Sequence, residues 1–340
     1  MSHSATRHAA KPSFLSRLAK TLYIILFVLS LIVVVGYAAL SLFAPKPTVD
    51  KQVTIGPNRG ADPKPPAAAT DSPDASPTPD PDALVLNRRD GVYTCLLLGV
   101  ADQGGTDTIM LGVFDTQAKT ASLVSIPRDT VVYRDGKYRK INSTYAGGEE
   151  AVAEAVHDLL GVPVDYWVSV NLKAFTSIVD QIGGVYFDVP VNMDYEDPYQ
   201  DLYIHIPAGY QLLDGSKAEG VMRCRSCYVN ADIGRAATQR AFLVALAKQT
   251  ITPSNAAKVT SLINTFNQYV RTDMPLNDMV WFGTQAIGMD LDAALATGSL
   301  EGEWISPYWQ LDDDAVLELV NGLGIYQEEV PARALHIVHP

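Results

Sequence analysis

An apolar segment near the N-terminus constrains on which side of a membrane the rest of the chain lies. Residues 22–44 carry no charged side chain and are rich in Ile, Leu, Val and Phe, enough for one helical crossing of a bilayer. Basic residues precede this segment, with no acidic residue among them: Arg7, Lys11, Arg17 and Lys20. Because basic flanks favour the cytoplasmic side, we expect a cytoplasmic tail at 1–21, a transmembrane helix at 22–44 and an extracytoplasmic remainder.

A cleaved signal peptide is the alternative interpretation of this segment. The apolar run is longer than the hydrophobic region of a typical signal peptide, and no clean small-x-small cleavage site follows it. These features favour an uncleaved anchor. The expected localisation is therefore the cell membrane, as a single-pass protein whose N-terminus is cytoplasmic and whose main domain is extracytoplasmic.

Composition divides the rest of the chain into three parts. Residues 45–84 are rich in Pro, Asp and Ala and nearly free of large apolar side chains, which predicts a disordered, extended linker. Apolar periodicity then continues across residues 85–324 without a second linker, a length that suits one large domain with a substantial core. Residues 325–340 form a C-terminal tail without an interpretable pattern.

Apolar patterns within residues 85–324 alternate between the periods of strands and helices. Strands are expected at 93–100, 110–114, 121–126 and 185–189, and amphipathic helices at 149–160 and 172–182, each helix being followed by glycine. This order predicts an α/β fold: a three-layer α/β/α domain in which helices cover a central mixed β-sheet.

The chain is acidic, which limits its partners. It has 26 Lys and Arg against 38 Asp and Glu, so that setting aside the four cations of the N-terminal tail leaves a net charge of −16 outside the membrane. Nucleic acid binding depends on neutralising phosphates with basic patches, which such a surface lacks. Nucleic acid is therefore excluded as a partner, and a local concentration of arginine becomes informative.

Residues 221–243 hold such a concentration: Arg223, Arg225, Arg235 and Arg240. Arg223 and Arg225 are two residues apart and would share a face of an extended segment. Arg235 and Gln239 are one turn apart on a helix. Both pairs are therefore spaced to face one ligand, and clustered guanidinium groups are typical of phosphate sites.

The helical pair continues into an apolar stripe that includes Phe242 and Leu246, which we expect to lie in the core. An arginine at the top of such a stripe is costly unless it meets an anion. Asp232 is the simple candidate, as a helix cap and ion-pair partner that supports the site structurally. One carboxylate does not neutralise three arginines, so the remaining charge predicts a ligand with two or more negative charges.

Acidic and basic side chains also stand at the ends of the predicted strands. Asp102 follows the first strand, Asp107 precedes the second, and Arg128 follows the third. Ligands of α/β folds gather at strand ends, and Mg²⁺ prefers one or two carboxylates completed by water and substrate phosphate. Asp102 and Asp107 are therefore candidate Mg²⁺ ligands, with a turn or cap role for each as the alternative.

Cys224 and Cys227 form a CxxC pair inside the arginine cluster, where an extracytoplasmic location permits disulfides. One CxxC without a second pair is poor evidence for zinc, and no thioredoxin-like strand and helix surround it. We expect either unpaired thiols or a local structural disulfide. Cys95 lies in an apolar strand and is expected in the core.

A series of motifs, in order along residues 90–310, resembles the LytR-CpsA-Psr family of cell-wall ligases. The segments are LLLGVAD, TDTIML, SLVSIPRDT, KINSTYAGG, LLGVPVDYWV, IGGV, DVP, GYQLLDG, MRCRS and DIGRAATQRAFL. One such segment is weak evidence, but the ordered set is specific. The chain departs from the family at Gly104 and Gly105, where members often carry an arginine before the TDT sequence.

The resemblance implies a Mg²⁺-dependent phosphotransferase that moves a glycopolymer, of teichoic acid or capsular polysaccharide type, from an undecaprenyl diphosphate carrier to peptidoglycan. Carried over by motif, Asp102 and Asp107 would hold Mg²⁺ against the diphosphate. Arg128 would lie closest to the transferred phosphate, which makes Asp107 and Arg128 the candidate catalytic residues. The remaining phosphate oxygens would be bound by Arg223, Arg225, Arg235 and Gln239.

The base that activates the acceptor hydroxyl stays open, because Asp107 could act directly or only by binding the metal. Phosphoryl transfer depends on positioning and charge neutralisation more than on covalent chemistry, so arginines and a metal can suffice. Two other functions also stay open. One is a hydrolase of polyprenyl-linked pyrophosphate, and the other is a non-catalytic, membrane-anchored envelope regulator.

Overall fold

The computed structural model describes residues 45–56, 83–100, 105–200, 202–228, 231–250, 270–286 and 289–340. The chain divides into two compact units, residues 1–46 and 47–340, and the described helices and strands belong to the second. The predicted tail 1–21 and transmembrane helix 22–44 lie outside the described residues. Within the described ranges, no helix is both long enough and apolar enough to cross a bilayer.

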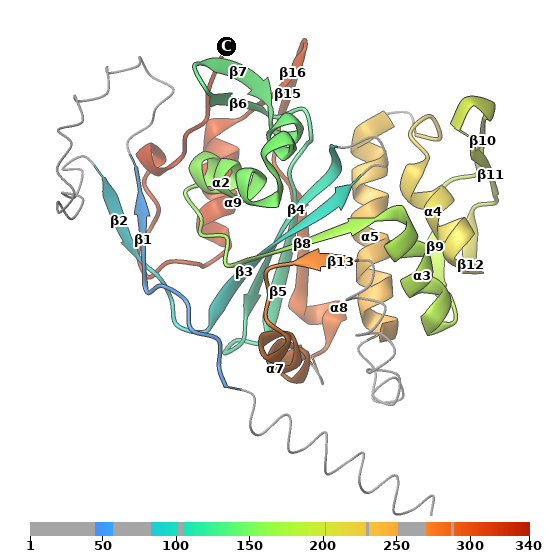
Figure 1. Cartoon of the computed structure of the whole chain (residues 1–340), viewed down its shortest axis with the longest axis horizontal. Coiled ribbons are helices and arrows are strands. Elements are labelled where there is room, and N and C mark those ends of the chain that lie inside the picture. The colour runs from blue at the N-terminus through green and yellow to red at the C-terminus, as the bar shows by residue number, and fades with distance from the viewer. Residues whose placement is uncertain are drawn as a thin grey trace, which may run out of the picture. The chain divides into compact units, whose positions relative to one another are not determined.

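A six-stranded mixed sheet lies at the centre of the second unit, in the order β13-β8-β3-β4-β5-β14 (Figure 1). Its strands are β3 (Val92–Val100), β4 (Thr106–Asp115), β5 (Thr120–Ser125), β8 (Tyr166–Asn171), β13 (Val270–Thr272) and β14 (Leu295–Ser299). β3 runs antiparallel to β4 and parallel to β8, while β5 runs antiparallel to β4 and parallel to β14. The prediction of an α/β fold with a central mixed sheet is confirmed.

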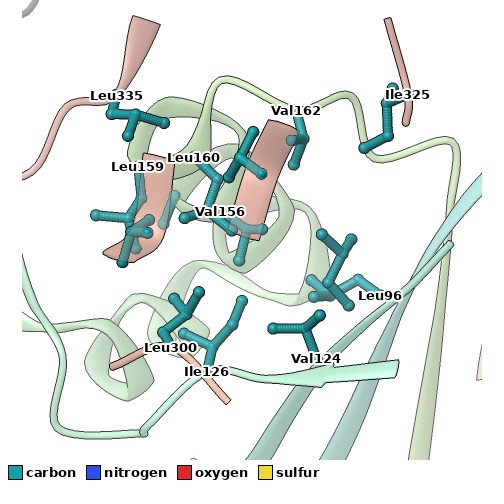
Figure 2. Packing of buried hydrophobic residues seen from close by; sticks show 14 of the residues in the cluster. Leu96, Val124, Ile126, Val156, Leu159, Leu160, Val162, Leu300, Ile325 and Leu335 are labelled. Carbon is teal, nitrogen blue, oxygen red and sulfur yellow. The ribbon is translucent and has the colours of Figure 1, made fainter. Parts of the chain in front are cut away.

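One face of this sheet carries the larger core. Helices α2 (Glu149–Leu160) and α9 (Asp313–Gly322) pack their apolar sides against it. Figure 2 shows Leu96, Val124 and Ile126 beneath Val156 and Leu160. Burying each such side chain contributes about 1.5–3 kcal/mol. The predicted helix at 149–160 is thereby confirmed, and its amphipathic pattern explains its position.

Aromatic packing covers part of the opposite face. Trp281 and Phe282 of α7 (Leu276–Ala286) meet rings projecting from neighbouring strands, with centroids 5.5 Å apart for Tyr93–Trp281 and 5.7 Å apart for Tyr166–Phe282. Because side chains alternate along β3, Tyr93 and Leu96 project to opposite faces of the sheet. Helices therefore lie on both faces.

A second core lies beside the sheet and is built around α5 (Ala231–Thr250). Its other elements are helices α3 (Leu172–Ile182) and α4 (Gly215–Arg223), the pair β9 (Val185–Val189) with β12 (Gly209–Leu213), and the pair β10 (Met193–Asp197) with β11 (Leu202–Ile206). The strand predicted at 185–189 is confirmed, but it pairs outside the central sheet.

Short elements complete the described part of the chain. They are β6 (Val131–Arg134), β7 (Lys137–Lys140), β15 (Gly302–Ile305), β16 (Tyr308–Leu311), helix α8 (Leu291–Ala294), and the 3₁₀ helices η1 (Ile141–Gly147), η2 (Pro198–Gln200) and η4 (Ala332–Ala334). The hairpins β6–β7 and β15–β16 lie at the same end of the molecule (Figure 1).

Two parts of the chain differ from the predicted domain boundaries. Residues 52–55, inside the expected linker 45–84, form β1 (Gln52–Ile55), which pairs with β2 (Leu84–Asn87) and buries Val53 and Ile55. The expected tail 325–340 is also part of the domain, because Ile325, Val330 and Leu335 lie in the larger core. In both cases a few apolar side chains are buried by partners distant in the sequence.

Candidate functional site

A pocket with a volume of about 1440 Å³ opens where β4, the end of β5, helix α5 and the β15–β16 hairpin meet. Its walls differ in charge. We call one wall the basic arm, formed by Arg128, Arg225, Arg235, Gln239 and Arg240 together with Asp107. The other is the acidic arm, formed by Glu301, Glu303, Trp304, Trp309 and Asp314. The pocket therefore has a side suited to an anion and a side that repels one.

Asp107 and Arg128 meet at the edge of the sheet. Asp107 is the second residue of β4, and Arg128 follows β5 in a turn closed by the N–H of Thr130 donating to the carbonyl of Pro127. Arg128 Nη1 forms an ion pair with Asp107 Oδ1. The Asp107 side chain is 47% exposed and that of Arg128 is 22% exposed, so both can reach a ligand from the pocket wall.

Asp129 holds Arg128 from the other side and links it to the hairpin. Its Oδ2 lies 3.8 Å from Arg128 Nε, and its Oδ1 lies 2.9 Å from Lys140 Nζ. The backbone N–H of Trp309 donates to the Asp129 carbonyl at 2.9 Å. The loop that carries Arg128 is therefore fixed to the acidic arm through the residue that follows it.

The predicted stripe of α5 faces inward as expected. Arg235 is 7% exposed, Gln239 is 5% exposed, and Phe242 is fully buried in the second core. Gln239 accepts a hydrogen bond from Thr108 Oγ1 at 3.1 Å and donates one to the Met222 carbonyl at 3.0 Å. This amide thereby ties β4, α4 and α5 together beside the pocket, and Arg235 stands one turn above it.

Arg240 also lines the pocket. The helical spacing of Arg235 and Gln239 did not predict this role. It lies one residue after Gln239 and so about 100° away from it around the helix. Its Nη1 donates to Ser125 Oγ, at the end of β5, at 2.9 Å, and burial lowers the pKa of this guanidinium. A cation held in a partly dry position favours an anionic ligand beside it.

Arg223 and Arg225 do not share an extended segment, contrary to the prediction. α4 continues to Arg223, whose Nη1 lies 2.9 Å from Glu219 Oε1, one helical turn earlier. Arg225 follows in the turn after the helix and lines the pocket, whereas Arg223 is not among the lining residues. Within the arginine cluster, the structure therefore brings Arg225, Arg235 and Arg240 to the pocket.

The CxxC pair spans this turn. Cys224 and Cys227 form a disulfide with their Cα atoms 5.7 Å apart, which confirms the local disulfide among the two expected alternatives. Cys224 is fully buried in the second core, so the bond anchors the turn on either side of Arg225. Cys95 is a free cysteine whose burial raises the pKa of its thiol to about 12, which keeps it protonated.

The metal prediction rests on Asp107 alone within the described part of the chain. Asp102 lies outside the described residues, and so does the side chain of Asp232. The described residues include no group of three or more His, Cys, Asp and Glu side chains that could hold a metal ion. Mg²⁺ binds through as few as one carboxylate when phosphate and water complete its shell. Asp107 therefore fits a Mg²⁺ ion that arrives with a phosphate ligand.

Comparisons with known proteins agree with this fold. The chain is 28% identical over 269 residues to the polyisoprenyl-teichoic acid–peptidoglycan teichoic acid transferase TagV of Bacillus subtilis, covering 75% of this chain and 64% of that protein. It is 31% identical over 194 residues to TagU of Bacillus licheniformis, covering 55% of this chain and 61% of that protein. These alignments thus span slightly less than two thirds of each relative.

The crystal structure of B. subtilis TagV superposes with a TM-score of 0.61 at 25% identity, covering 69% of this chain and 96% of the crystallised one. The family model described as the LytR_cpsA_psr family matches residues 65–323, which is more than half of the chain. The resemblance drawn from the motifs is thereby confirmed. The chain belongs to the LytR_cpsA_psr family.

Proposed function

We propose that this protein is an extracytoplasmic phosphotransferase that moves a glycopolymer from an undecaprenyl diphosphate carrier to peptidoglycan. The observation that carries the proposal is the basic arm: four arginines, one after β5, one in the turn after α4 and two on α5, that line one pocket of a protein with a net charge of −12. A diphosphate matches that charge, and clustered arginines bind phosphate oxygens through paired N–H donors. The transferase names of TagV and TagU support the same reaction class.

The reaction exchanges one P–O bond for another. The acceptor hydroxyl oxygen attacks the phosphorus that bears the glycopolymer, and the P–O bond to the bridging oxygen of the diphosphate breaks. Polyprenyl phosphate leaves with that bond's electron pair, and the hydroxyl proton goes to a base. The product is a phosphodiester between glycopolymer and wall, and the atoms balance without a further reactant.

The basic arm would stabilise the charge that develops during this exchange. Arg128, which follows β5 at the edge of the sheet, would bind the transferred phosphoryl group, while Arg225, Arg235 and Arg240 would bind the second phosphate. Gln239 would hold α5, and with it Arg235, against β4 and α4 through its hydrogen bonds to Thr108 and to the Met222 carbonyl. Arg223 would contribute only by leaving Glu219 and turning into the pocket.

Asp107 would serve as a metal ligand, with Asp102 as the second candidate. Mg²⁺, when bound, supplies charge neutralisation of the diphosphate oxygens. The Asp107 ion pair with Arg128 is partly exposed, so the carboxylate can exchange arginine for a metal as phosphate takes its place beside Arg128. Whether Asp107 also accepts the hydroxyl proton depends on where the acceptor stands relative to that ion.

The proposal includes the layout of the whole chain. Residues 1–21 would be cytoplasmic, residues 22–44 would anchor the protein in the membrane, and the linker would place the pocket within reach of a lipid-linked substrate. Apolar side chains between the sheet and its helices would accommodate the prenyl chain. The polymer class, teichoic acid or capsular polysaccharide, would be decided by groups outside the basic arm.

The test is transfer of a radiolabelled glycan from an undecaprenyl diphosphate carrier to purified peptidoglycan by the full chain in proteoliposomes. We expect label in the insoluble wall fraction with Mg²⁺ and its loss with EDTA. Label released as a soluble glycan phosphate would instead identify a hydrolase. Absence of both products, with tight binding of the lipid, would support the non-catalytic regulator.

A further inference from the structure

We propose that the acidic arm binds the sugar acceptor, with Trp304 as a stacking surface for a neutral glycan chain, an inference that rests on the proposed function. The basic arm accounts for a diphosphate, but it occupies only one side of the 1440 Å³ pocket. The other side is continuous with it and has the opposite charge. A group transfer needs a second substrate beside the first, so this side is the remaining place within the pocket.

Charge decides which class of molecule fits there. Glu301 and Glu303 are exposed, and neither forms an ion pair with any residue that the structure describes. Asp314 stands beside them in the first turn of α9. Carboxylates at this density repel a second polyanion, but they accept hydrogen bonds from hydroxyl and N-acetyl N–H groups. The arm therefore favours a neutral, hydroxyl-rich ligand over another phosphate polymer.

Trp304 supplies the apolar surface that a sugar ring needs. Its side chain belongs to β15, lines the pocket and is 54% exposed, so a broad apolar face is open to a ligand there. Lys140 Nζ lies 5.5 Å from the ring centroid over one face of the indole. This cation orients the ring from one side and leaves its other face for stacking.

The hairpin that carries Trp304 is fixed relative to the reacting phosphate. Lys140, which covers the indole, also pairs with Asp129, the residue after Arg128. Trp309 on the partner strand β16 donates its backbone N–H to Asp129. Its indole Nε1 is buried and has no hydrogen-bond partner among the described residues. A ligand seated on Trp304 would thus be held in register with Arg128.

The experiment measures binding of a neutral β-1,4-linked N-acetylglucosamine tetramer to the full chain by calorimetry. We expect Trp304→Ala to weaken this binding about tenfold and Glu303→Gln about threefold, at an unchanged affinity for undecaprenyl diphosphate. Tyr203→Ala is the matched control, because Tyr203 is 56% exposed on β11 and does not line the pocket. Far-ultraviolet circular dichroism confirms that each variant is folded.

Carboxylates would also attract a cationic peptide. The salt dependence of binding distinguishes such a peptide from a neutral glycan. Binding of the neutral tetramer should persist at about 0.5 M NaCl, whereas an amine-bearing peptide would be screened. The inference is overturned if the wild type binds only such peptides, if it does not bind the tetramer, or if Trp304→Ala binds it as well as the wild type.

Turnover distinguishes this inference from the proposed function. If the wild type transfers glycan to peptidoglycan and Trp304→Ala leaves the KM for peptidoglycan unchanged, the acceptor site is wrong while the transferase stands. If tetramer binding depends on Trp304 but no donor is ever turned over, the glycan site stands and the transferase is wrong. If both the transferase and the acceptor site are right, Trp304→Ala should raise the KM for peptidoglycan and leave the KM for the lipid donor unchanged.

Discussion

Single arginines in and beside the basic arm differ in how far neighbouring carboxylates compensate their charge. Arg128 has Asp107 and Asp129 beside it, and Arg223 has Glu219. Arg240 instead donates to a neutral hydroxyl and sits where burial lowers its pKa. A charge in that position costs stability unless a ligand compensates it.

Arg240→Met therefore separates stability from binding. We expect an unchanged or higher midpoint of thermal unfolding, because the variant replaces a partly buried charge by an apolar side chain of similar length. We expect about tenfold weaker binding of undecaprenyl diphosphate, the loss of one charged hydrogen bond. Arg139→Met, at an ion pair with Asp135 outside the pocket, is the control. A midpoint several degrees lower would make Arg240 a structural residue instead.

Arg225 and Arg223 form a natural pair of variants. Arg225→Ala should weaken binding of undecaprenyl diphosphate about tenfold, because Arg225 lines the pocket. Arg223→Ala should change it less than about twofold, because the side chain pairs with Glu219 instead. The measurement is the affinity of each purified variant for undecaprenyl diphosphate. Equal losses would mean that Arg223 turns into the pocket when the diphosphate binds, as the motif implies.

Among the helices and strands, those predicted from the sequence are the ones whose buried face follows a local apolar pattern. The apolar stripe of α5 and the alternation of β9 each mark a buried face directly. α4 was missed because glycine weakens its helical signal at Gly215 and Gly220. Gly220 lies in the helix where an added Cβ would come within 3.2 Å of Ile206. Close packing against β11 favours glycine at this position, and this contact is invisible in a local pattern.

The turn that presents Arg225 depends on a second close contact, between Tyr228 and Gly234 of α5. A Cβ at Gly234 would stand 2.6 Å from Tyr228 Cβ, so Gly234→Ala must displace the turn. We expect weaker binding of undecaprenyl diphosphate in this variant despite a better intrinsic helix propensity. Gly322→Ala, where no atom lies within 4 Å of the added Cβ, is the control. Unchanged binding by Gly234→Ala would mean that the turn does not position Arg225.

At the scale of the whole molecule, the C-terminal segment shows why domain limits were harder to predict than elements. Its buried residues are separated by polar ones, so residues 325–340 have no period to recognise. Their partners are distant: the N–H of Gln327 donates to the carbonyl of Asn87 at 2.9 Å, and that of His336 donates to Leu159 at 3.1 Å. The acidic arm was missed for the same reason, since β15–β16 reaches Arg128 only through tertiary contacts.

Ile325→Ala tests whether this segment stabilises the domain. Ile325 is 1% exposed in the larger core, so the variant should lower the free energy of unfolding by about 2–5 kcal/mol. Val85→Ala, at a side chain 47% exposed, should change it by less than about 0.5 kcal/mol. Urea unfolding of both variants makes the comparison. Equal stabilities would show that residues 325–340 are dispensable for the fold.

Arg128 is proposed to stabilise the phosphoryl group in transfer, and the transfer rate of Arg128→Lys at saturating donor and Mg²⁺ tests this role. Lysine keeps the charge but loses the paired N–H donors of arginine. The matched control is Arg134→Lys, whose side chain is 24% exposed against 22% for Arg128 and lies outside the pocket lining. We expect a rate of label transfer to peptidoglycan lower by about 10²–10³-fold for Arg128→Lys and unchanged for the control. A wild-type rate in Arg128→Lys would show that the paired N–H donors of Arg128 do not stabilise the transferred phosphoryl group.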